Sequence, residues 1–497
     1  MNSFAVSRIA ALLQGIRPRY TSSTTLSLDL SKNWTNSTVT LNSITKPSGV
    51  PNLDVPSLWY HAAENVLYTG FTGEHVINQN DSDLPSLSLW ALKPDNSGGG
   101  TWTEAINADN ASAWGSLVYV SGGLQSYDSN SAYVLGGVAD LSGVWVPGLV
   151  EFDMSLRNFT NHSTSTTRAQ DLDGINKGAL VYVPSFGPQG LYVAMGGWTK
   201  SGSGFFSTVH VYDPSAQEWY QQLTTGTYPS DRVEFCAAGV NSTNGTFEIF
   251  MYAGWNGNDY GIQDDTINIL SLPAFHWIQV EYTPEHGRLA HTCHSVGGSQ
   301  ILIIGGMDAN PKLGHTSNFT ALIESDFNST ADPNAQGLGV FDMTSLTWAS
   351  QYTANMPDYE WSQPIKEFYQ DSNKAYVQNL DQNVLSLVDI THFAPTANSS
   401  SNSSTSTTSN TTPISTSSSK TSNAGAIAGG VVGGVVGLAL IAALIFFFLR
   451  RRRRNGRRGE YQPPNSGNGY FKSELHNEDR KFAELDGPER QEMGGEG

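Results

Sequence analysis

Hydrophobic positions follow two different patterns along this chain of 497 residues. Between about residues 20 and 395, short runs of Val, Leu, Ile, Tyr and Phe alternate with Gly, Asn, Asp and Pro. Runs of this kind, bounded by turn-forming residues, predict many short β-strands. From Ala424 to Leu449 the chain is apolar throughout and has no charged side chain, which predicts one long helix.

The apolar run Ala424–Leu449 is long enough to cross a lipid bilayer. As a helix its 26 residues span roughly 39 Å, whereas the hydrocarbon core of a bilayer is about 30 Å thick. Arg450–Arg454 follows directly, and basic residues next to a span stay on the cytoplasmic side. We therefore predict a single-pass protein of the plasma membrane or another secretory-pathway membrane. Its N-terminus would lie outside, and residues 450–497 would form a polar cytoplasmic tail.

The strand-rich region contains a repeated unit. Its first part is an apolar strand that ends in two small residues, as in Ala132–Gly137, Leu191–Gly197 and Ile301–Gly306. A second strand with an Asp or another small residue at its turn follows, as in Val209–Asp213. An aromatic residue then ends each unit, 57 to 71 residues after the previous one, at Trp34, Trp102, Phe159, Trp219, Trp277 and Trp348.

These units resemble kelch repeats, because the double glycine, the Tyr/Phe-Asp turn and the terminal Trp stand in the order of that family. The resemblance implies an all-β fold, a kelch-type β-propeller over residues 20–395 whose blades share a core with their neighbours. We predict six blades, with seven as the alternative. A partial unit at Leu26–Trp34 is expected to complete the last blade, and Gln363–Asp389 is expected to supply strand-like pieces.

The whole chain is similar to fungal membrane-anchored kelch proteins, which join a propeller, a Ser/Thr stalk, one span and a basic, then acidic tail. The residues that carry this likeness are Leu270–Trp277, Arg288–Cys293 and Glu484–Gly487. Residues 396–423 are dominated by Ser and Thr, which predicts an extended, O-glycosylated stalk. Residues 1–19 offer only a weak or truncated signal region.

Charge and glycosylation signals support the same topology. The chain has 27 basic and 45 acidic side chains, and 11 of the basic ones follow the span, so the outer part is strongly acidic and unsuited to nucleic acid. Every Asn-x-Ser/Thr sequon precedes the span, which predicts a glycoprotein. The sequons are Asn33, Asn36, Asn80, Asn110, Asn158, Asn161, Asn241, Asn244, Asn318, Asn328, Asn398, Asn402 and Asn410.

The two cysteines stand at similar places in consecutive units. Cys236 and Cys293 each follow an arginine by a few residues, so neighbouring blades would bring them together as a disulfide or leave them as two buried thiols. His291 and His294 flank Cys293, but alternation along a strand points them to opposite faces. We therefore predict no metal site here. The chain shows no catalytic motif either, and we expect no catalytic residues and no cofactor.

The sequence thus predicts a cell-surface module that binds an extracellular protein or glycan and is not an enzyme. The alternative is a membrane-tethered carbohydrate-active oxidase or lyase that uses the propeller pocket. Small residues at four-residue intervals share one face of the span and predict a helix-packing interface for a homodimer. They are Gly425, Gly429, Gly433 and Gly437. Arg450–Arg454 is expected to contact membrane lipid.

Overall fold

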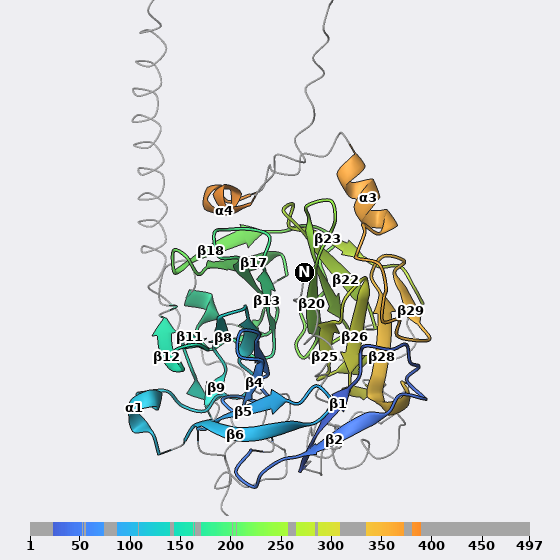
Figure 1. Cartoon of the computed structure of the whole chain (residues 1–497). Coiled ribbons are helices and arrows are strands. Elements are labelled where there is room, and N and C mark those ends of the chain that lie inside the picture. The colour runs from blue at the N-terminus through green and yellow to red at the C-terminus, as the bar shows by residue number, and fades with distance from the viewer. Residues whose placement is uncertain are drawn as a thin grey trace, which may run out of the picture. The chain divides into compact units, whose positions relative to one another are not determined.

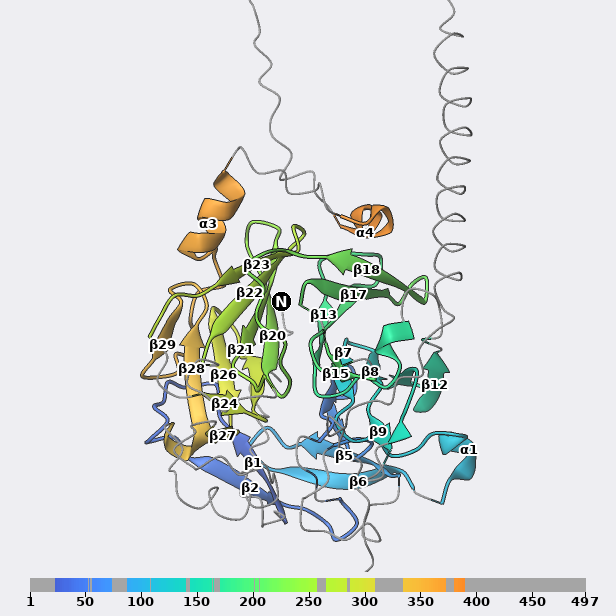
Figure 2. The same cartoon turned by 180° about the vertical axis from the view of Figure 1, so that it is seen from behind.

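The computed structural model describes residues 23–388 except 52, 54–55, 74–86, 108, 140–143, 163, 165–169, 201, 205, 257–264, 284–286, 309–333 and 372–379. Within these ranges strands dominate and surround a common centre (Figures 1 and 2). Among the described residues, no helix is long and apolar enough to cross a membrane. The predicted signal region, stalk, span and tail all lie outside the described residues, as do the four glycines and Arg450–Arg454.

Among the described residues, five sheets form the blades, each with four antiparallel strands in chain order, and the sheet of blade 4 has one further, parallel strand. Blade 1 contains β3 (Trp59–His61), β4 (Val66–Thr69), β5 (Leu89–Pro94) and β6 (Gly100–Ile106). Blade 2 contains β7 (Leu124–Tyr127), β8 (Ser131–Leu135), β11 (Leu149–Asp153) and β12 (Asn158–His162). Blade 3 contains β13 (Ala179–Val183), β14 (Leu191–Met195), β17 (Thr208–Asp213) and β18 (Glu218–Leu223). Blade 4 contains β20 (Cys236–Asn241), β21 (Phe247–Tyr252), β22 (Ile267–Leu272) and β23 (His276–Gln279). Blade 5 contains β25 (Thr292–Ser295), β26 (Gln300–Ile304), β28 (Leu338–Asp342) and β29 (Thr347–Ala349).

Shorter elements lie between these strands. Three two-stranded ribbons are β9 (Val138–Ala139) with β10 (Val144–Trp145), β15 (Trp198–Thr199) with β16 (Gly202–Ser203), and β24 (Arg288–Leu289) with β27 (Met307–Asp308). The strand β19 (Thr225–Gly226) leaves blade 3 and pairs in parallel with β23, so it ties blade 3 to blade 4. The helical turns are α1 (Ala111–Trp114), η2 (Gln170–Leu172) and η4 (Ala335–Gly337).

The prediction of six blades, and its alternative of seven, is wrong, because the structure has five four-stranded blades. Between blades 5 and 1 lies a two-stranded sheet of β1 (Thr24–Leu28) and β2 (Leu41–Thr45) (Figure 1). The N-terminal strand therefore pairs with its own neighbour in the chain and does not complete the last blade. The contact with blade 5 comes instead from Trp34, which forms a backbone bridge with Tyr352 and stacks on its ring.

The C-terminal part of the described chain is helical, so the strand-like pieces expected over Gln363–Asp389 are also a wrong prediction. The described residues form α3 (Gln363–Gln370) and α4 (Gln382–Leu387). Proline in the first turn favours the start of α3. Ile365, Phe368 and Tyr369 are its buried residues, and their helical spacing places them on one face against blade 4.

The aspartates at the third-strand turns act as predicted from the repeats. Oδ1 of Asp153, Asp213 and Asp342 each accepts a hydrogen bond of 2.9 Å from the backbone N–H two residues later. This Asx arrangement reverses the chain between the third and fourth strands. The terminal aromatics then pack between blades: Trp277 is buried and donates its Nε1–H to the Phe206 carbonyl of blade 3 at 2.9 Å.

The double glycines bring the backbones of neighbouring blades together. Gly137 donates its N–H to the Ile175 carbonyl at 2.7 Å, and the equivalent bond from Gly254 to Arg288 measures 2.9 Å. Both glycines have positive φ, and a Cβ on the preceding Gly136 would lie 2.3 Å from the Ile175 carbonyl oxygen. Only glycine permits this approach, which explains why the repeat requires it.

Antiparallel connectivity gives the ring two distinct ends. We call the end with the connections after each blade's second strand the loop end, and the opposite end the helix end. Near the helix end, Gly187 in the β13–β14 turn donates its N–H to the Leu387 carbonyl of α4 at 2.9 Å. In the β20–β21 turn, Thr246 Oγ1 accepts from Trp361 Nε1, just before α3, at 2.7 Å. The described chain therefore ends on the side away from the loop end.

Candidate functional site

The first strands of the five blades surround a central cavity of about 530 Å³. Much of its wall consists of backbone and small residues, because glycine and alanine recur on these strands. The small residues that line it are Gly122, Gly123, Gly178, Ala179, Ala237, Ala238, Gly239 and Ala290. A narrow ring of strands with small side chains leaves an open space on the axis instead of a packed core.

The loop end of this cavity is framed by a chain of backbone hydrogen bonds. Lys177 donates its N–H to Gly122, Glu234 donates to Lys177, and Ala290 donates to Glu234, over 2.7 to 2.9 Å. These four residues each stand two positions before the first strand of blades 2 to 5, and all have positive φ. Left-handed backbone is unfavourable for Lys, Glu and Ala. The repeated backbone hydrogen bonds between blades hold these residues in the left-handed conformation.

Two of these positions carry opposite charges. The Lys177 ammonium forms an ion pair with the Glu234 carboxylate, and the Glu234 side chain is only 8% exposed. Both residues line the cavity, so the ion pair connects blades 3 and 4 at the rim. A pair this sheltered from water is screened less than a surface pair.

Two tryptophans stand beside this ion pair at the loop end. Trp198 forms a backbone bridge with Asn176, and Trp255 forms the equivalent bridge with Val233, directly before Lys177 and Glu234 respectively. The two indole rings meet edge to face with centroids 5.6 Å apart, and both side chains are half-buried. Half-buried tryptophans next to fixed charges are typical anchor positions of protein interfaces.

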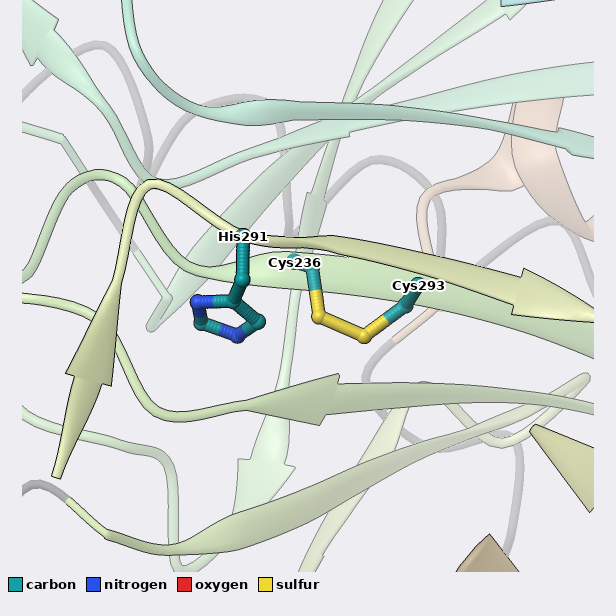
Figure 3. A group of neighbouring side chains, drawn as sticks. All are labelled: Cys236, His291 and Cys293. Atoms are coloured by element: carbon teal, nitrogen blue, oxygen red, sulfur yellow. A yellow bond between two sulfur atoms is a disulfide. The ribbon is translucent and has the colours of Figure 1, made fainter. Parts of the chain in front are cut away.

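The wall between blades 4 and 5 contains both cysteines. Cys236 and Cys293 are joined by a disulfide with Cα atoms 5.3 Å apart, a usual spacing. The His291 ring lies beside it, and the three ligand atoms are within 4.8 Å of one another (Figure 3). Burial and the nearby charge of Arg288 lower the pKa of His291 to about 3, so its imidazole is neutral. No metal site was predicted for His291 and Cys293; the structure does bring them together, with Cys236 from the next blade as third member.

Two further titratable groups line the cavity. Tyr127 is 40% exposed and His294 is also exposed, so both side chains are accessible to solvent in the cavity. Within the described ranges, no hydrogen bond or ion pair joins His291 or His294 to Tyr127 or Tyr182. The two histidines and two tyrosines thus line one cavity without contacting one another through these bonds.

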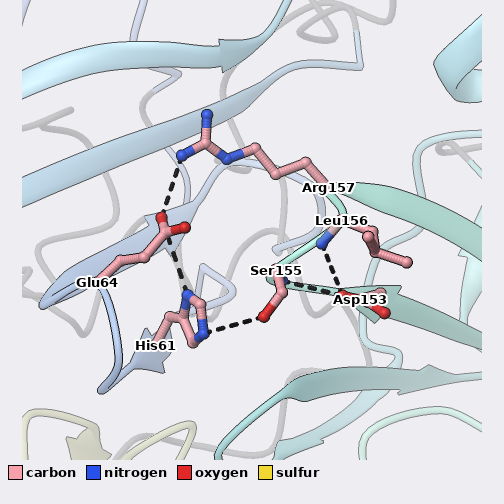
Figure 4. Close-up of polar contacts among 6 residues, drawn as sticks. All are labelled: His61, Glu64, Asp153, Ser155, Leu156 and Arg157. Atoms are coloured by element: carbon pink, nitrogen blue, oxygen red, sulfur yellow. Dashed lines mark hydrogen bonds and ion pairs between the residues drawn. The ribbon is translucent and has the colours of Figure 1, made fainter.

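A second polar cluster lies where blades 1 and 2 meet (Figure 4). Ser155 Oγ is 3.4 Å from His61 Nε2, whose Nδ1 is 3.9 Å from a Glu64 carboxylate oxygen, and Arg157 pairs with the same carboxylate at 3.1 Å. The order resembles a nucleophile, base and acid. However, 3.9 Å exceeds a hydrogen bond, His61 is 1% exposed, and none of the four lines the cavity. The cluster therefore links the β3–β4 turn of blade 1 to the β11–β12 turn of blade 2.

The described sequons differ in accessibility. Six of them have an exposed asparagine: Asn33, Asn110, Asn158, Asn161, Asn241 and Asn244. Asn36 is half-buried and donates its side-chain N–H to the Leu338 carbonyl at 3.2 Å, so it is the least suited to carry a glycan. Glycosylation itself stays a prediction. The other sequons lie outside the described residues: Asn80, Asn318, Asn328, Asn398, Asn402 and Asn410.

Sequence reasoning missed the rim formed by Lys177, Glu234, Trp198 and Trp255. A signal was present, because Trp198 directly follows Gly196–Gly197, and Trp255 directly follows Gly254 at the end of another apolar run, Phe250–Gly254. Two bulky aromatics at one repeat position, outside the strand, indicate a role at the loop end. The Lys177–Glu234 pairing had no such signal, since it depends on contact between blades.

Comparison with known proteins agrees with this architecture. No protein-family model matches the chain. A "Kelch repeat-containing protein" of Arthroderma benhamiae is 26% identical over 371 residues, which cover 66% of this chain and 52% of that protein. The chain therefore spans about half the length of this relative. Together, the five-bladed ring and this similarity support a kelch-type β-propeller, a class that suggests a protein-interaction module.

Proposed function

We propose that this protein is a cell-surface binding module whose propeller recognises an extracellular protein partner at its loop end. The observation that carries the proposal is the adjacent pair Trp198 and Trp255 beside the Lys177–Glu234 ion pair. Aromatic anchors next to a fixed charge pair provide apolar contact area and orientation together. Loops on a rigid ring are also the usual place for recognition.

The proposed membrane anchor follows the propeller in the sequence. The described chain reaches its last residue near the helix end, and the apolar run Ala424–Leu449 follows farther along the sequence. We propose that this run anchors the protein in the membrane. The Ser/Thr-rich residues 396–423 would act as the spacer between the propeller and this anchor.

Affinity capture with variants of the full-length chain tests the binding face. We expect the double variant Trp198→Ser/Trp255→Ser to retain at least about tenfold less partner from an extracellular protein fraction than the wild type. The control is Leu156→Ser, which removes a 72% exposed apolar side chain from the β11–β12 turn at the helix end. Thermal denaturation of each variant checks that the ring still folds.

The outcomes separate the alternatives. Equal capture by the double variant and the control would place the binding site elsewhere. Binding to a glycan array without any protein partner would replace the proposed ligand by a glycan. Glycosidase treatment of intact cells tests the topology, since only an outer propeller would lose mass. Among the described residues we find nothing that favours the oxidase or lyase alternative.

A further inference from the structure

The cavity wall between blades 4 and 5 contains the described chain's one group of three neighbouring side chains able to ligate a metal: Cys236, His291 and Cys293. The cysteines lie on β20 and β25, and His291 precedes β25 by one residue. Cys236 is 6% exposed and His291 is 4% exposed. All three residues border the cavity, so a bound ion would be sheltered by the fold yet reachable from the axis.

The position of His291 is held by its surroundings. Its Nε2–H donates a hydrogen bond of 3.2 Å to the Tyr252 carbonyl, and its ring packs edge to face on the Tyr252 ring at 5.1 Å. Gly306 allows this placement, because a Cβ there would lie 2.6 Å from the His291 Cβ. The other ring nitrogen, Nδ1, lies near the Leu289 backbone but makes no hydrogen bond of standard geometry within the described ranges. The buried neutral ring therefore keeps one unused lone pair.

We propose that reduction of the Cys236–Cys293 disulfide turns this wall into a Cys₂His site for a thiophilic d¹⁰ cation such as Zn²⁺. A dithiol or phosphine supplies two electrons, the S–S bond breaks, and each sulfur takes up one proton. Binding of Zn²⁺ then releases both thiol protons and leaves a neutral unit of one ion, two thiolates and one imidazole. If the nitrogen that binds is Nε2, the ring proton moves to Nδ1.

The distances suit such an ion. Zn–S bonds are about 2.3 Å and Zn–N bonds about 2.0 Å, which places tetrahedral ligand atoms roughly 3.3 to 3.8 Å apart. The three ligand atoms already lie within 4.8 Å of one another, so the two sulfurs need only separate after reduction. Soft thiolates with an imidazole select Zn²⁺ or Cu⁺ over hard cations. Three protein ligands leave a fourth position open, as in catalytic zinc sites.

Cobalt titration of the full-length chain tests this directly. The wild type is compared in its oxidised form and after phosphine reduction without oxygen, with Co²⁺ as a spectroscopic probe for Zn²⁺. We expect one equivalent of Co²⁺ to bind to the reduced form with thiolate-to-cobalt absorption bands, and Zn²⁺ to displace it. The oxidised form should show no such bands. This comparison needs no substitution, so a folding defect of a variant cannot obscure it.

Variants assign the ligands. In the reduced state, Cys293→Ser should weaken Zn²⁺ binding by at least about 100-fold, and His291→Gln should weaken it by at least about tenfold. His294→Ala is the matched control, since His294 lines the same cavity without belonging to the three-residue group. The proposal is overturned if the reduced wild type shows no thiolate bands, if it loses its fold on reduction, or if Cys293→Ser binds as tightly as the wild type.

Discussion

The junctions that join blade 2 to blade 3, blade 3 to blade 4 and blade 4 to blade 5 differ from the junction that closes the ring between blades 5 and 1. At these three junctions one backbone pattern recurs. A residue with left-handed backbone before each first strand donates its N–H to the carbonyl of the equivalent residue in the previous blade. At the closure, the β1–β2 sheet stands between blades 5 and 1, and side chains make much of the contact. Trp34 and Tyr352 stack with ring centroids 5.1 Å apart, and Tyr352 donates its hydroxyl to the Leu30 carbonyl at 3.1 Å.

This difference shows two ways to join blades. A repeated backbone bond needs only a residue that tolerates the local φ, so it can recur with different side chains such as Lys177, Glu234 and Ala290. The closing junction brings together the two ends of the described propeller and needs particular aromatic side chains. We therefore expect substitutions that add side-chain atoms to destabilise the repeated junctions. Substitutions that remove side-chain atoms should destabilise the closing junction.

The largest expected effect is at a repeated junction. Gly136 has φ +66°, and a Cβ there would lie 2.3 Å from the carbonyl oxygen of Ile175, on the segment that leads into blade 3. Gly136→Ala should lower the free energy of unfolding by about 3 to 4 kcal/mol, from backbone strain together with overpacking. Denaturant unfolding of the purified chain measures this loss. The control is Gly297→Ala, where φ is +96° but no atom lies within 4 Å.

Because Gly297→Ala creates no close contact, its loss of unfolding free energy measures backbone strain alone, which should be about 1 to 2 kcal/mol. Equal losses for the two alanine variants would mean that close approach between blades adds nothing at the double glycine.

The next effect is at the closing junction. Trp34 is 8% exposed, and Trp34→Ala should lower the free energy of unfolding by about 3 kcal/mol through the cavity it leaves. Hydrogen exchange should show β1 and β2 losing protection before blades 2 to 4. Trp348→Ala, at a 38% exposed tryptophan, should cost less. Simultaneous loss of protection in every blade would contradict a separate closing junction.

An intermediate effect concerns a buried acid beside α3. Glu248 is fully buried, and burial raises the pKa of its carboxyl to about 8 although Thr246 and Ser271 donate hydrogen bonds to it. The folded state therefore holds a proton that the unfolded chain releases near pH 4.5. Between these pH values, stability should fall by about 1.4 kcal/mol for each unit of rising pH.

Denaturant unfolding at pH 5 to 9 measures this slope. Glu248→Gln, which is neutral and of similar shape, should have a smaller slope over the same range. An unchanged slope in the variant would assign the pH dependence to other groups.

The smallest effect is expected where blades 1 and 2 meet. Arg157 and Glu64 pair at 3.1 Å, but their side chains are 50% and 38% exposed. Arg157→Ala should change the free energy of unfolding by less than about 0.5 kcal/mol, because exposed ion pairs are screened by water. Lys32→Ala removes a more exposed pair with Asp29 and serves as the reference in the same unfolding experiment. A loss above about 1 kcal/mol only for Arg157 would show that this junction depends on charge.

Much of the fold was predictable because its signals are local. The double glycines, the turn aspartates and the terminal aromatics lie within single repeats. The structure places the glycines directly after second strands, the aspartates at third-strand turns and the aromatics of the five blades on fourth strands. The number of blades was predicted wrongly, because Leu26–Trp34 has the signals of a repeat but lacks the partner strands of one. The rim residues Lys177 and Glu234 could not be paired from sequence, since each lies in a different blade.

The sequence by itself determined the class of fold, because strand period, turn chemistry and repeat spacing are properties of short segments. It also supplied the apolar run Ala424–Leu449 and the sequons, on which the proposed membrane topology rests. Only the tertiary structure decided how many four-stranded blades form, which end carries the tryptophan pair, and that His291 lies beside the two cysteines. These features arise where blades meet, and packing between blades sets the distances there.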